Sequence, residues 1–155
     1  MVSSVQNQFL SFHEFYSIDS NELDLSVNKI NSSILKTTYE VRLLIMNRNV
    51  EYTINKRYNE FAGFYDTLTI KYKNLNFPEF PSKFQLFNKE ETRKNNFSKL
   101  LQFVLTLSVN HREIKRDLMK ILYEFLFPQG ITKPESFKPI HRLSVKDNPK
   151  EILGL

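Results

Sequence analysis

The spacing of the apolar side chains changes abruptly near position 57. Residues 38–46 and 50–56 contain β-branched residues and stretches in which apolar and polar side chains alternate, and the polar run 47–49 supplies turn residues between them. From Phe61 to Tyr72 the apolar residues recur every three or four positions, and Asn59 is available as an N-cap. The change predicts a β-hairpin that leads directly into a helix of roughly twelve residues.

Two more helices are predicted after a segment that contains prolines. Pro78 and Pro81 end the first helix and keep the next segment extended, because each fixes its own φ and disfavours helix in the preceding residue. A second helix is predicted to begin near Asn88, where Glu91 completes a capping-box pattern. The apolar spacing over residues 112–126 predicts a third helix.

The two ends of the chain give weaker patterns. Residues 9–16 alternate imperfectly and predict a first strand, and the polar run 19–36 predicts a loop. Four of the six prolines fall after position 127, which favours an extended tail or one wrapped over the domain. We therefore expect an extension over 1–8, one folded domain over 9–127 and a tail over 128–155.

The composition limits the classes of protein. A chain of 155 residues with 41% hydrophobic residues and 3 glycines is expected to form one packed domain. Its net charge of +5 indicates an anionic partner, which could be nucleic acid, an acidic protein or lipid headgroups. The absence of cysteine excludes a disulfide framework and fits a cytoplasmic protein. No signal peptide or membrane-spanning stretch is expected.

The sequence offers no constellation for catalysis. His13, His111 and His141 are scattered, without the spacing of a metal site, and no glycine-rich phosphate loop or nucleophile elbow is present. The aromatic residues lie in core stripes rather than among the basic residues, which argues against a nucleic-acid stacking surface. We expect a protein that is not an enzyme, with no metal, no cofactor and no nucleic-acid partner.

Three cationic side chains stand at the junctions between the predicted elements. Arg57 ends the hairpin, Lys83 follows the proline segment, and Arg93 lies near the start of the second helix. Arg57 is out of phase with the apolar row that starts at Val50, so it leaves the sheet on the other side. Together the three cations suggest a phosphate-binding pocket.

Arg93 lies on the same helical stripe as the apolar residues that follow it. A guanidinium on an inward-facing side is costly unless an anion or several acceptors meet it, which favours a ligand. Alternatively, Arg93 lies near enough to the helix start to reach water. The stripe comprises Phe97, Leu100, Leu101, Val104 and Leu107.

The order of these motifs resembles that of the phox-homology (PX) domain, and the resemblance covers about residues 9–127. It is carried by the run from Lys56 to Phe61, the proline segment from Pro78 to Lys83, the run from Arg93 to Leu101 and a last helix that ends at Leu126. The resemblance implies an α+β fold, in which a three-stranded antiparallel sheet packs against a helical subdomain. It also implies a module that binds phosphoinositides.

The resemblance assigns a role to each residue of the pocket. Arg57 would bind the 3-phosphate of a phosphatidylinositol headgroup, and a guanidinium suits this because it can bond two oxygens at once. Tyr58 would form the floor on which the inositol ring stacks, Lys83 would meet the 1-phosphate, and Arg93 would bond the 4- and 5-hydroxyls. This set is the one associated with phosphatidylinositol 3-phosphate.

Other residues are expected to contact the membrane around the pocket. The membrane-insertion loop would present Phe84, Leu86 and Phe87, although Leu86 could instead cover the core under the second helix. Glu79 replaces a proline found in many family members, which could weaken attraction to an acidic surface. Accessory contacts with anionic lipids would come from Lys56, Lys89 and Lys94.

The resemblance thus implies a peripheral membrane protein, similar to a small sorting nexin. It would read phosphatidylinositol 3-phosphate on endosomal or vacuolar membranes and act in protein sorting. The alternative is an interaction adaptor, in which the PX-like core is a scaffold and the tail docks a protein partner. The tail residues available for such docking are Phe137, Ile140, Leu143, Ile152 and Leu153.

Overall fold

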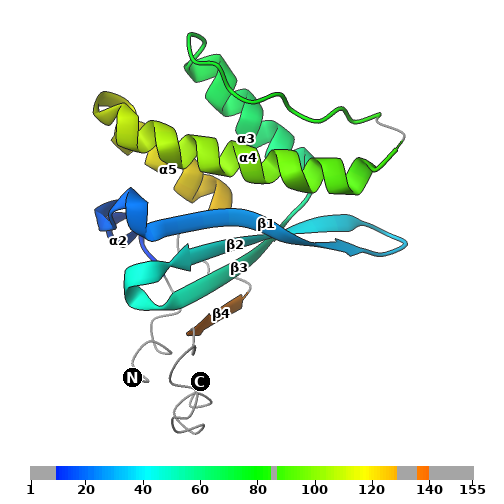
Figure 1. Ribbon diagram of the computed structural model, residues 1–155, viewed down its shortest axis with the longest axis horizontal. Coiled ribbons are helices and arrows are strands. Elements are labelled where there is room, and N and C mark those ends of the chain that lie inside the picture. Colours follow the sequence, from blue (N-terminus) through cyan, green and yellow to red (C-terminus); the bar gives the residue numbers. More distant parts are fainter. Residues whose placement is uncertain (1–9, 85–86, 129–135, 140–155) are drawn as a thin grey trace, which may run out of the picture.

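An antiparallel sheet and a layer of helices on one of its faces form the structure (Figure 1). The computed structural model describes residues 10–84, 87–128 and 136–139. This arrangement confirms the predicted α+β class. In chain order the elements are α2 (Phe12–Ser17), η1 (Ser20–Glu22), β1 (Leu23–Ser32), β2 (Thr37–Ile45), η2 (Met46–Arg48), β3 (Val50–Lys56), α3 (Tyr58–Lys71), α4 (Lys89–Asn110), η3 (Arg112–Ile114), α5 (Lys115–Leu126) and β4 (Ser136–Pro139).

The sheet has the strand order β1, β2, β3, β4, and each strand is antiparallel to the next. Strands β2 and β3 are the predicted hairpin, and Asn49 adopts a left-handed conformation with φ 54° just before β3. β4 comes from the segment that the sequence assigned to the tail. It pairs with the outer edge of β3, where Phe137 lies opposite Tyr52. The sheet therefore has one strand more than the three that were predicted.

Strand β1 shows that the loop predicted over residues 19–36 was wrong. Alternate residues from Leu23 to Val27 are buried, as in a strand with one face on the core. The pairing then shifts between Val27 and Lys29, which marks a bulge of one additional residue. The bulge packs against α4, where the N–H of Val27 donates to Ser98 Oγ at 2.7 Å. Because the bulge interrupts the alternation, the sequence pattern hides the strand.

Helix α2 lies where the sequence predicted a first strand over residues 9–16, and that prediction was wrong. The N–H of Glu14 donates to Ser11 Oγ at 3.1 Å, and the Glu14 carboxylate accepts the N–H of Ser11 at 3.1 Å. This capping box stabilises a short helix that local propensity alone would not. Phe15 holds the helix on α5, with its ring centroid 5.7 Å from that of Tyr123.

The helices that follow the hairpin occur where they were predicted, but their N-terminal caps differ. Arg57 is the N-cap of α3, and its N–H donates to Glu60 Oε1 at 2.8 Å. Asn59 therefore lies in the first turn and is not the cap. Asn88 is the N-cap of α4, but its side chain makes no capping hydrogen bond and its φ is 49°. The predicted capping box with Glu91 is thus not formed.

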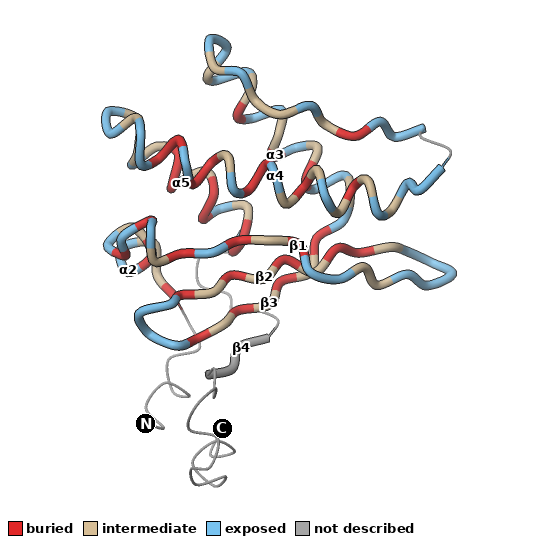
Figure 2. Tube along the Cα trace, viewed as in Figure 1, coloured by how far each residue is buried: buried red, intermediate tan, exposed pale blue. Residues whose placement is uncertain are grey.

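Phe97 of α4 joins the sheet to the helices. It is fully buried, and its ring stacks on Phe61 of α3 with centroids 4.0 Å apart. Tyr39 of β2 meets the same ring edge-on at 5.1 Å, and Phe80 of the proline segment lies 5.6 Å away. The predicted stripe of α4 is buried throughout (Figure 2), namely at Phe97, Leu100, Leu101, Val104 and Leu107.

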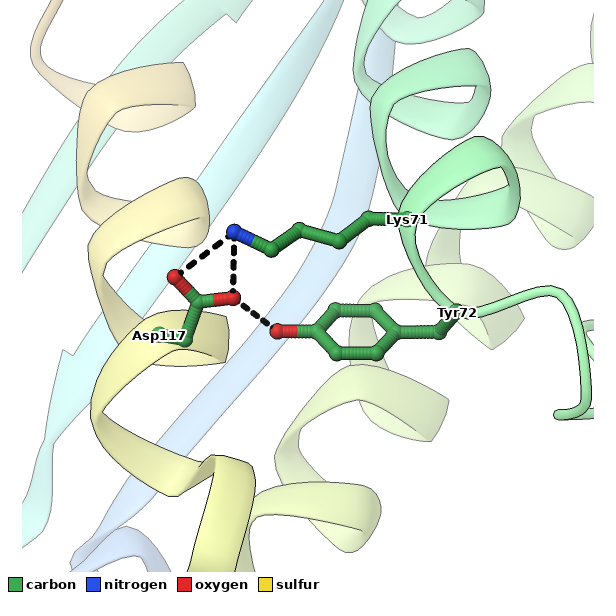
Figure 3. Close-up of polar contacts among 3 residues, drawn as sticks. All are labelled: Lys71, Tyr72 and Asp117. Atoms are coloured by element: carbon green, nitrogen blue, oxygen red, sulfur yellow. Dashed lines mark hydrogen bonds and ion pairs between the residues drawn. The ribbon is translucent and has the colours of Figure 1, made fainter.

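A polar cluster connects the end of α3 to the start of α5 (Figure 3). Lys71 Nζ lies 2.9 and 3.0 Å from the two carboxylate oxygens of Asp117, and the Tyr72 hydroxyl donates to the same carboxylate. These hydrogen bonds, from Tyr72 and then from Lys71, hold the pKa of Asp117 below its ordinary value. Burial, together with the bond to Asp117, raises the pKa of the Tyr72 phenol.

Replacing Asp117 with asparagine should lower the free energy of unfolding by about 0.5–1 kcal/mol at neutral pH, since an ion pair this exposed is partly screened. The pKa of Asp117 is lower in the folded chain than in the unfolded chain. The stability that Asp117 contributes is therefore fully present at pH values above its pKa in the unfolded chain. It is lost as the pH falls through its pKa in the folded chain. Urea unfolding of both proteins from about pH 7 to about pH 3 should show the difference shrinking. A difference that stays constant would contradict this account.

Candidate functional site

Arg93 lies on the buried side of α4, and only 8% of its surface is exposed. Its guanidinium carbon lies 4.1 Å from the centroid of the Tyr58 ring. One terminal nitrogen donates to the Tyr39 hydroxyl at 3.4 Å, and the other donates to the carbonyl of Lys83 at 3.2 Å. Nε is buried and has no hydrogen-bond partner among the described residues. Arg93 thus faces inward, as its stripe predicted, and it does not lie in the solvent-exposed first turn.

Tyr58 connects α3 to the proline segment at this site. Its hydroxyl donates to the carbonyl of Pro81 at 2.8 Å, and its ring lies 5.3 Å from that of Phe80. Burial raises the pKa of the Tyr58 phenol, and the nearby charge of Arg93 opposes part of that rise. The phenol therefore stays neutral and remains a donor at physiological pH. Its bond to Pro81 fixes the backbone two residues before Lys83.

Arg57 lies at the first turn of α3, directly before Tyr58. Its backbone is extended, with φ −95° and ψ 165°, and its side chain is exposed. The N-terminus of a helix carries a partial positive charge and unpaired N–H groups, which favour an anion there. The guanidinium of Arg57 adds a full charge at the same end of the helix.

The structure brings Arg93, Tyr58 and the backbone of Lys83 together. Arg93 contacts both Tyr58 and the backbone of Lys83, and Arg57 is the chain neighbour of Tyr58. Within the described residues, no ion pair joins Arg57, Lys83 or Arg93 to a carboxylate. Three positive charges without internal compensation favour an anionic ligand.

Two of the three residues predicted for membrane insertion can be placed. Phe84 is 83% exposed and Phe87 is 79% exposed, so neither covers the core. Both lie between Lys83 and the start of α4, next to the cationic cluster. Leu86 lies outside the described residues.

The predicted accessory lysines differ in their surroundings. Lys89 is exposed at the start of α4, and Lys94 is partly exposed, with its Nζ 3.8 Å from a carboxylate oxygen of Glu91. Lys56 is only 4% exposed, and its Nζ lies 3.7 Å from a carboxylate oxygen of Glu60. The period-two pattern of β3 explains this burial, since Lys56 continues the row of Val50. A contact between Lys56 and a membrane surface does not fit this position.

Other parts of the described chain offer less for an anion. A hollow of about 280 Å³ between α3 and α5 is lined in part by Glu60 and Glu124, and none of the predicted site residues lines it. No three His, Asp or Glu side chains of the described residues are grouped so that they could hold a metal. No helix among the described residues is long and apolar enough to cross a bilayer.

Comparison with protein families gives a result that agrees with this geometry. The model of the PX domain matches residues 44–129, which is more than half of the chain and contains Arg57, Tyr58, Lys83 and Arg93. The chain therefore belongs to the PX-domain family. PX domains are lipid-binding modules, and membership supports phosphoinositide binding and peripheral membrane association in membrane trafficking. Comparison with curated proteins gave no match.

Proposed function

We propose that this PX domain binds phosphatidylinositol 3-phosphate and thereby recruits the protein to endosomal or vacuolar membranes, where it acts in protein sorting. Arg57 binds the 3-phosphate through two N–H groups of its guanidinium fork. Lys83 meets the 1-phosphate, and Arg93 donates to the 4- and 5-hydroxyls. The inositol ring lies against Tyr58.

The observation that carries this proposal is the burial of Arg93 without a carboxylate. A buried charge costs several kcal/mol unless acceptors surround it, and unpaired buried donors are rare in folded proteins. The hydroxyl oxygens of an inositol ring would supply the acceptors that the described residues do not. The neighbouring cations Arg57 and Lys83 would neutralise the phosphates of the same headgroup.

The contacts of Arg93 also favour a monophosphate. Its two terminal nitrogens already donate to Tyr39 and to the carbonyl of Lys83. A further phosphate at position 4 or 5 would bring about −1.5 to −2 charges to this side of the ring. Hydroxyl groups at these positions require fewer hydrogen-bond donors than a phosphate would. They therefore match the N–H groups of Arg93 that are not already bonded to Tyr39 or Lys83.

Membrane attachment would draw on the surroundings of the pocket as well. Burying Phe84 and Phe87 in the bilayer would contribute about 1.5–3 kcal/mol each. Lys89 would add about 1 kcal/mol near an anionic leaflet, and Lys94 less because of its pairing with Glu91. A micromolar affinity requires about 8 kcal/mol, which these contributions reach together with the pocket.

The test is sedimentation with liposomes that carry each phosphoinositide in turn. Wild type should bind the 3-phosphate liposomes selectively, and Arg57→Ala should weaken this binding at least about a hundredfold, because two hydrogen bonds to a charged group contribute about 1.5–3 kcal/mol each. Arg48→Ala is the matched control, since Arg48 is an exposed cation at the other end of β3.

Two results would contradict the proposal. One is the absence of selective binding in wild type, and the other is wild-type binding by Arg57→Ala. If recruitment in cells survives in Arg57→Ala but is lost when residues 140–155 are removed, which leaves β4 in place, the protein is an adaptor that docks a partner.

A further inference from the structure

The surface between α2 and the first turns of α5 combines aromatic rings with cationic side chains. Phe12 and Tyr16 of α2 stack on each other, with ring centroids 5.7 Å apart. Arg116 of α5 lies over both rings, with its guanidinium carbon 5.3 Å from each centroid. Lys115 Nζ lies 5.6 Å from the centroid of Tyr16. Lys120 Nζ lies 4.9 Å from that of Phe12. We call these five residues the α2–α5 patch.

The charge of this patch is largely uncompensated. Among the described residues, Lys115 and Arg116 form no ion pair, and neither does Arg112, which is exposed in η3 one turn before Arg116. The carboxylates of α2, η3 and α5 already have partners, namely Glu14 with Ser11, Glu113 with His111, Asp117 with Lys71 and Tyr72, and Glu124 with Lys120. The surface therefore favours an anionic ligand.

The rings order the cations without using their hydrogen-bond donors. A ring attracts a cation through its π face. The N–H groups at the edge of the Arg116 guanidinium stay available, and their fork matches the two oxygens of a carboxylate. Because the long side chains are already held in place, a ligand that binds them loses less affinity to side-chain ordering.

The patch lies at the opposite end of the molecule from the proposed lipid pocket (Figure 1). At about 1.5 Å per residue, α4 extends about 26 Å from Arg93 to Asn110, and α5 begins beyond that end, at Lys115. Charges are screened over about 8 Å at physiological ionic strength. A bilayer that embeds Phe84 and Phe87 at the start of α4 would therefore act little on the patch.

We infer that the α2–α5 patch is a docking site for an acidic segment of a partner protein, bound while the other end of the domain holds the membrane. The choice of a protein over a lipid surface rests on the proposed function, since that function directs the opposite end of the molecule to the bilayer. The site itself goes beyond that function and does not depend on it.

The dimensions of the patch suit a short acidic segment. From Arg112 to Lys120 the cations extend about 12 Å along the chain direction of η3 and α5. About four residues of an extended chain cover this length, so about two or three carboxylates can meet the cations. Nucleic acid fits less well, because the two rings stack on each other beneath the cations and leave little ring surface for bases.

The first test measures, by fluorescence anisotropy, the binding of a labelled decapeptide of alternating glutamate and glycine. Lys115→Gln combined with Arg116→Gln should weaken binding about tenfold or more, because charge-assisted hydrogen bonds are lost. Lys29→Gln combined with Lys99→Gln is the matched control, which removes the same charge from exposed positions outside the patch and should change affinity by less than about twofold. Arg57→Ala should bind the peptide like wild type, which separates the patch from the lipid pocket.

A second variant tests the role of the rings. Phe12→Leu combined with Tyr16→Leu keeps every charge of the patch and replaces the rings by apolar side chains. Affinity for the peptide should fall about threefold to tenfold, because the cations lose the rings that order them. Urea unfolding of each variant shows that it is folded, and the glutamine variant should remain so, since glutamine is a good helix former.

A third measurement determines which way the patch faces on a membrane. Wild type bound to phosphatidylcholine vesicles that carry phosphatidylinositol 3-phosphate should bind the peptide within about twofold of its affinity in solution. The variant with Lys115→Gln and Arg116→Gln should partition onto the same vesicles like wild type.

Several results would overturn the inference. Wild type that does not bind the peptide at low salt, a glutamine variant that binds it like wild type, or a control variant that loses as much would each show that the patch is not the site. A glutamine variant that loses vesicle binding would assign the patch to the membrane, and tighter binding of a ten-uridine RNA at the same residues would assign it to nucleic acid. If wild type binds no phosphoinositide vesicle while the glutamine variant still loses the peptide, the proposed function fails and the docking site stands.

Discussion

Arg93→Met should reduce phosphoinositide binding at least about a hundredfold and leave the domain as stable as wild type or more stable. Two lost hydrogen bonds to a ligand, at about 1.5–3 kcal/mol each, account for the loss of affinity. Methionine has a similar volume and can still pack against Tyr58, while a buried charge without a carboxylate is removed, which is often neutral or stabilising. Headgroup titration by calorimetry and unfolding in urea measure the two effects separately.

Lys94→Met is the matched control for this prediction. It makes the same kind of substitution one residue further along α4, at a partly exposed side chain that pairs with Glu91. Headgroup affinity should change by less than about threefold, as expected for a screened surface charge. If Arg93→Met retains affinity, or if it unfolds the domain, the account of Arg93 as a ligand-binding residue is wrong.

Phe97→Ala should lower the free energy of unfolding by about 3–5 kcal/mol, the largest effect on stability that we expect of any single change. The Phe97 ring is fully buried and contacts Tyr39, Phe61 and Phe80, which come from β2, α3 and the proline segment. Alanine would leave a cavity where these three parts of the fold meet. The midpoint of urea unfolding, compared at constant slope, measures the loss.

Phe84→Ala provides the contrast, because the same atoms are removed from a side chain that is 83% exposed. Its free energy of unfolding should stay within about 0.5 kcal/mol of wild type. A loss below about 1 kcal/mol in Phe97→Ala would show that the neighbouring rings close the cavity and that Phe97 is not central to packing.

The elements with regular apolar spacing could be predicted from the sequence. β2 and β3 alternate over enough residues, and α3 and α4 repeat their apolar positions over several turns, so one buried face determines each element. Their caps could not be predicted in the same way. Arg57 serves as an N-cap although its side chain accepts no hydrogen bond, because Glu60 meets its N–H instead.

The remaining elements depend on contacts distant in sequence. β1 loses its alternation at the bulge after Val27, and Ser98 of α4 meets that irregular backbone. β4 is only four residues long, and it pairs with a strand that lies more than eighty residues earlier in the chain. No pattern in the neighbouring sequence predicts that pairing. α2 did carry a signal, the Ser11 and Glu14 capping pair, and it was outweighed by the apparent alternation.

The sequence predicted candidate residues for the site through their motifs, but it did not predict the residues that support them. Arg57, Tyr58, Lys83 and Arg93 lie in motifs that resemble the family pattern. Tyr39 gave no such signal, since an inward tyrosine in a strand looks like any other core residue, yet its hydroxyl accepts a hydrogen bond from Arg93. Lys56 does not fit the predicted contact with anionic lipids, because it continues the buried row of β3.

The pairing of β4 with β3 has a consequence for solubility. The backbone of β4 pairs with β3 from Val50 to Thr53, on the edge that β2 does not occupy. A chain cut after Pro128 would leave those N–H and C=O groups of β3 open to pairing with another molecule, which is the usual route to edge-to-edge aggregation. The segment after the last helix thus protects the domain from self-association, and any shortened version of the protein should retain it through Pro139.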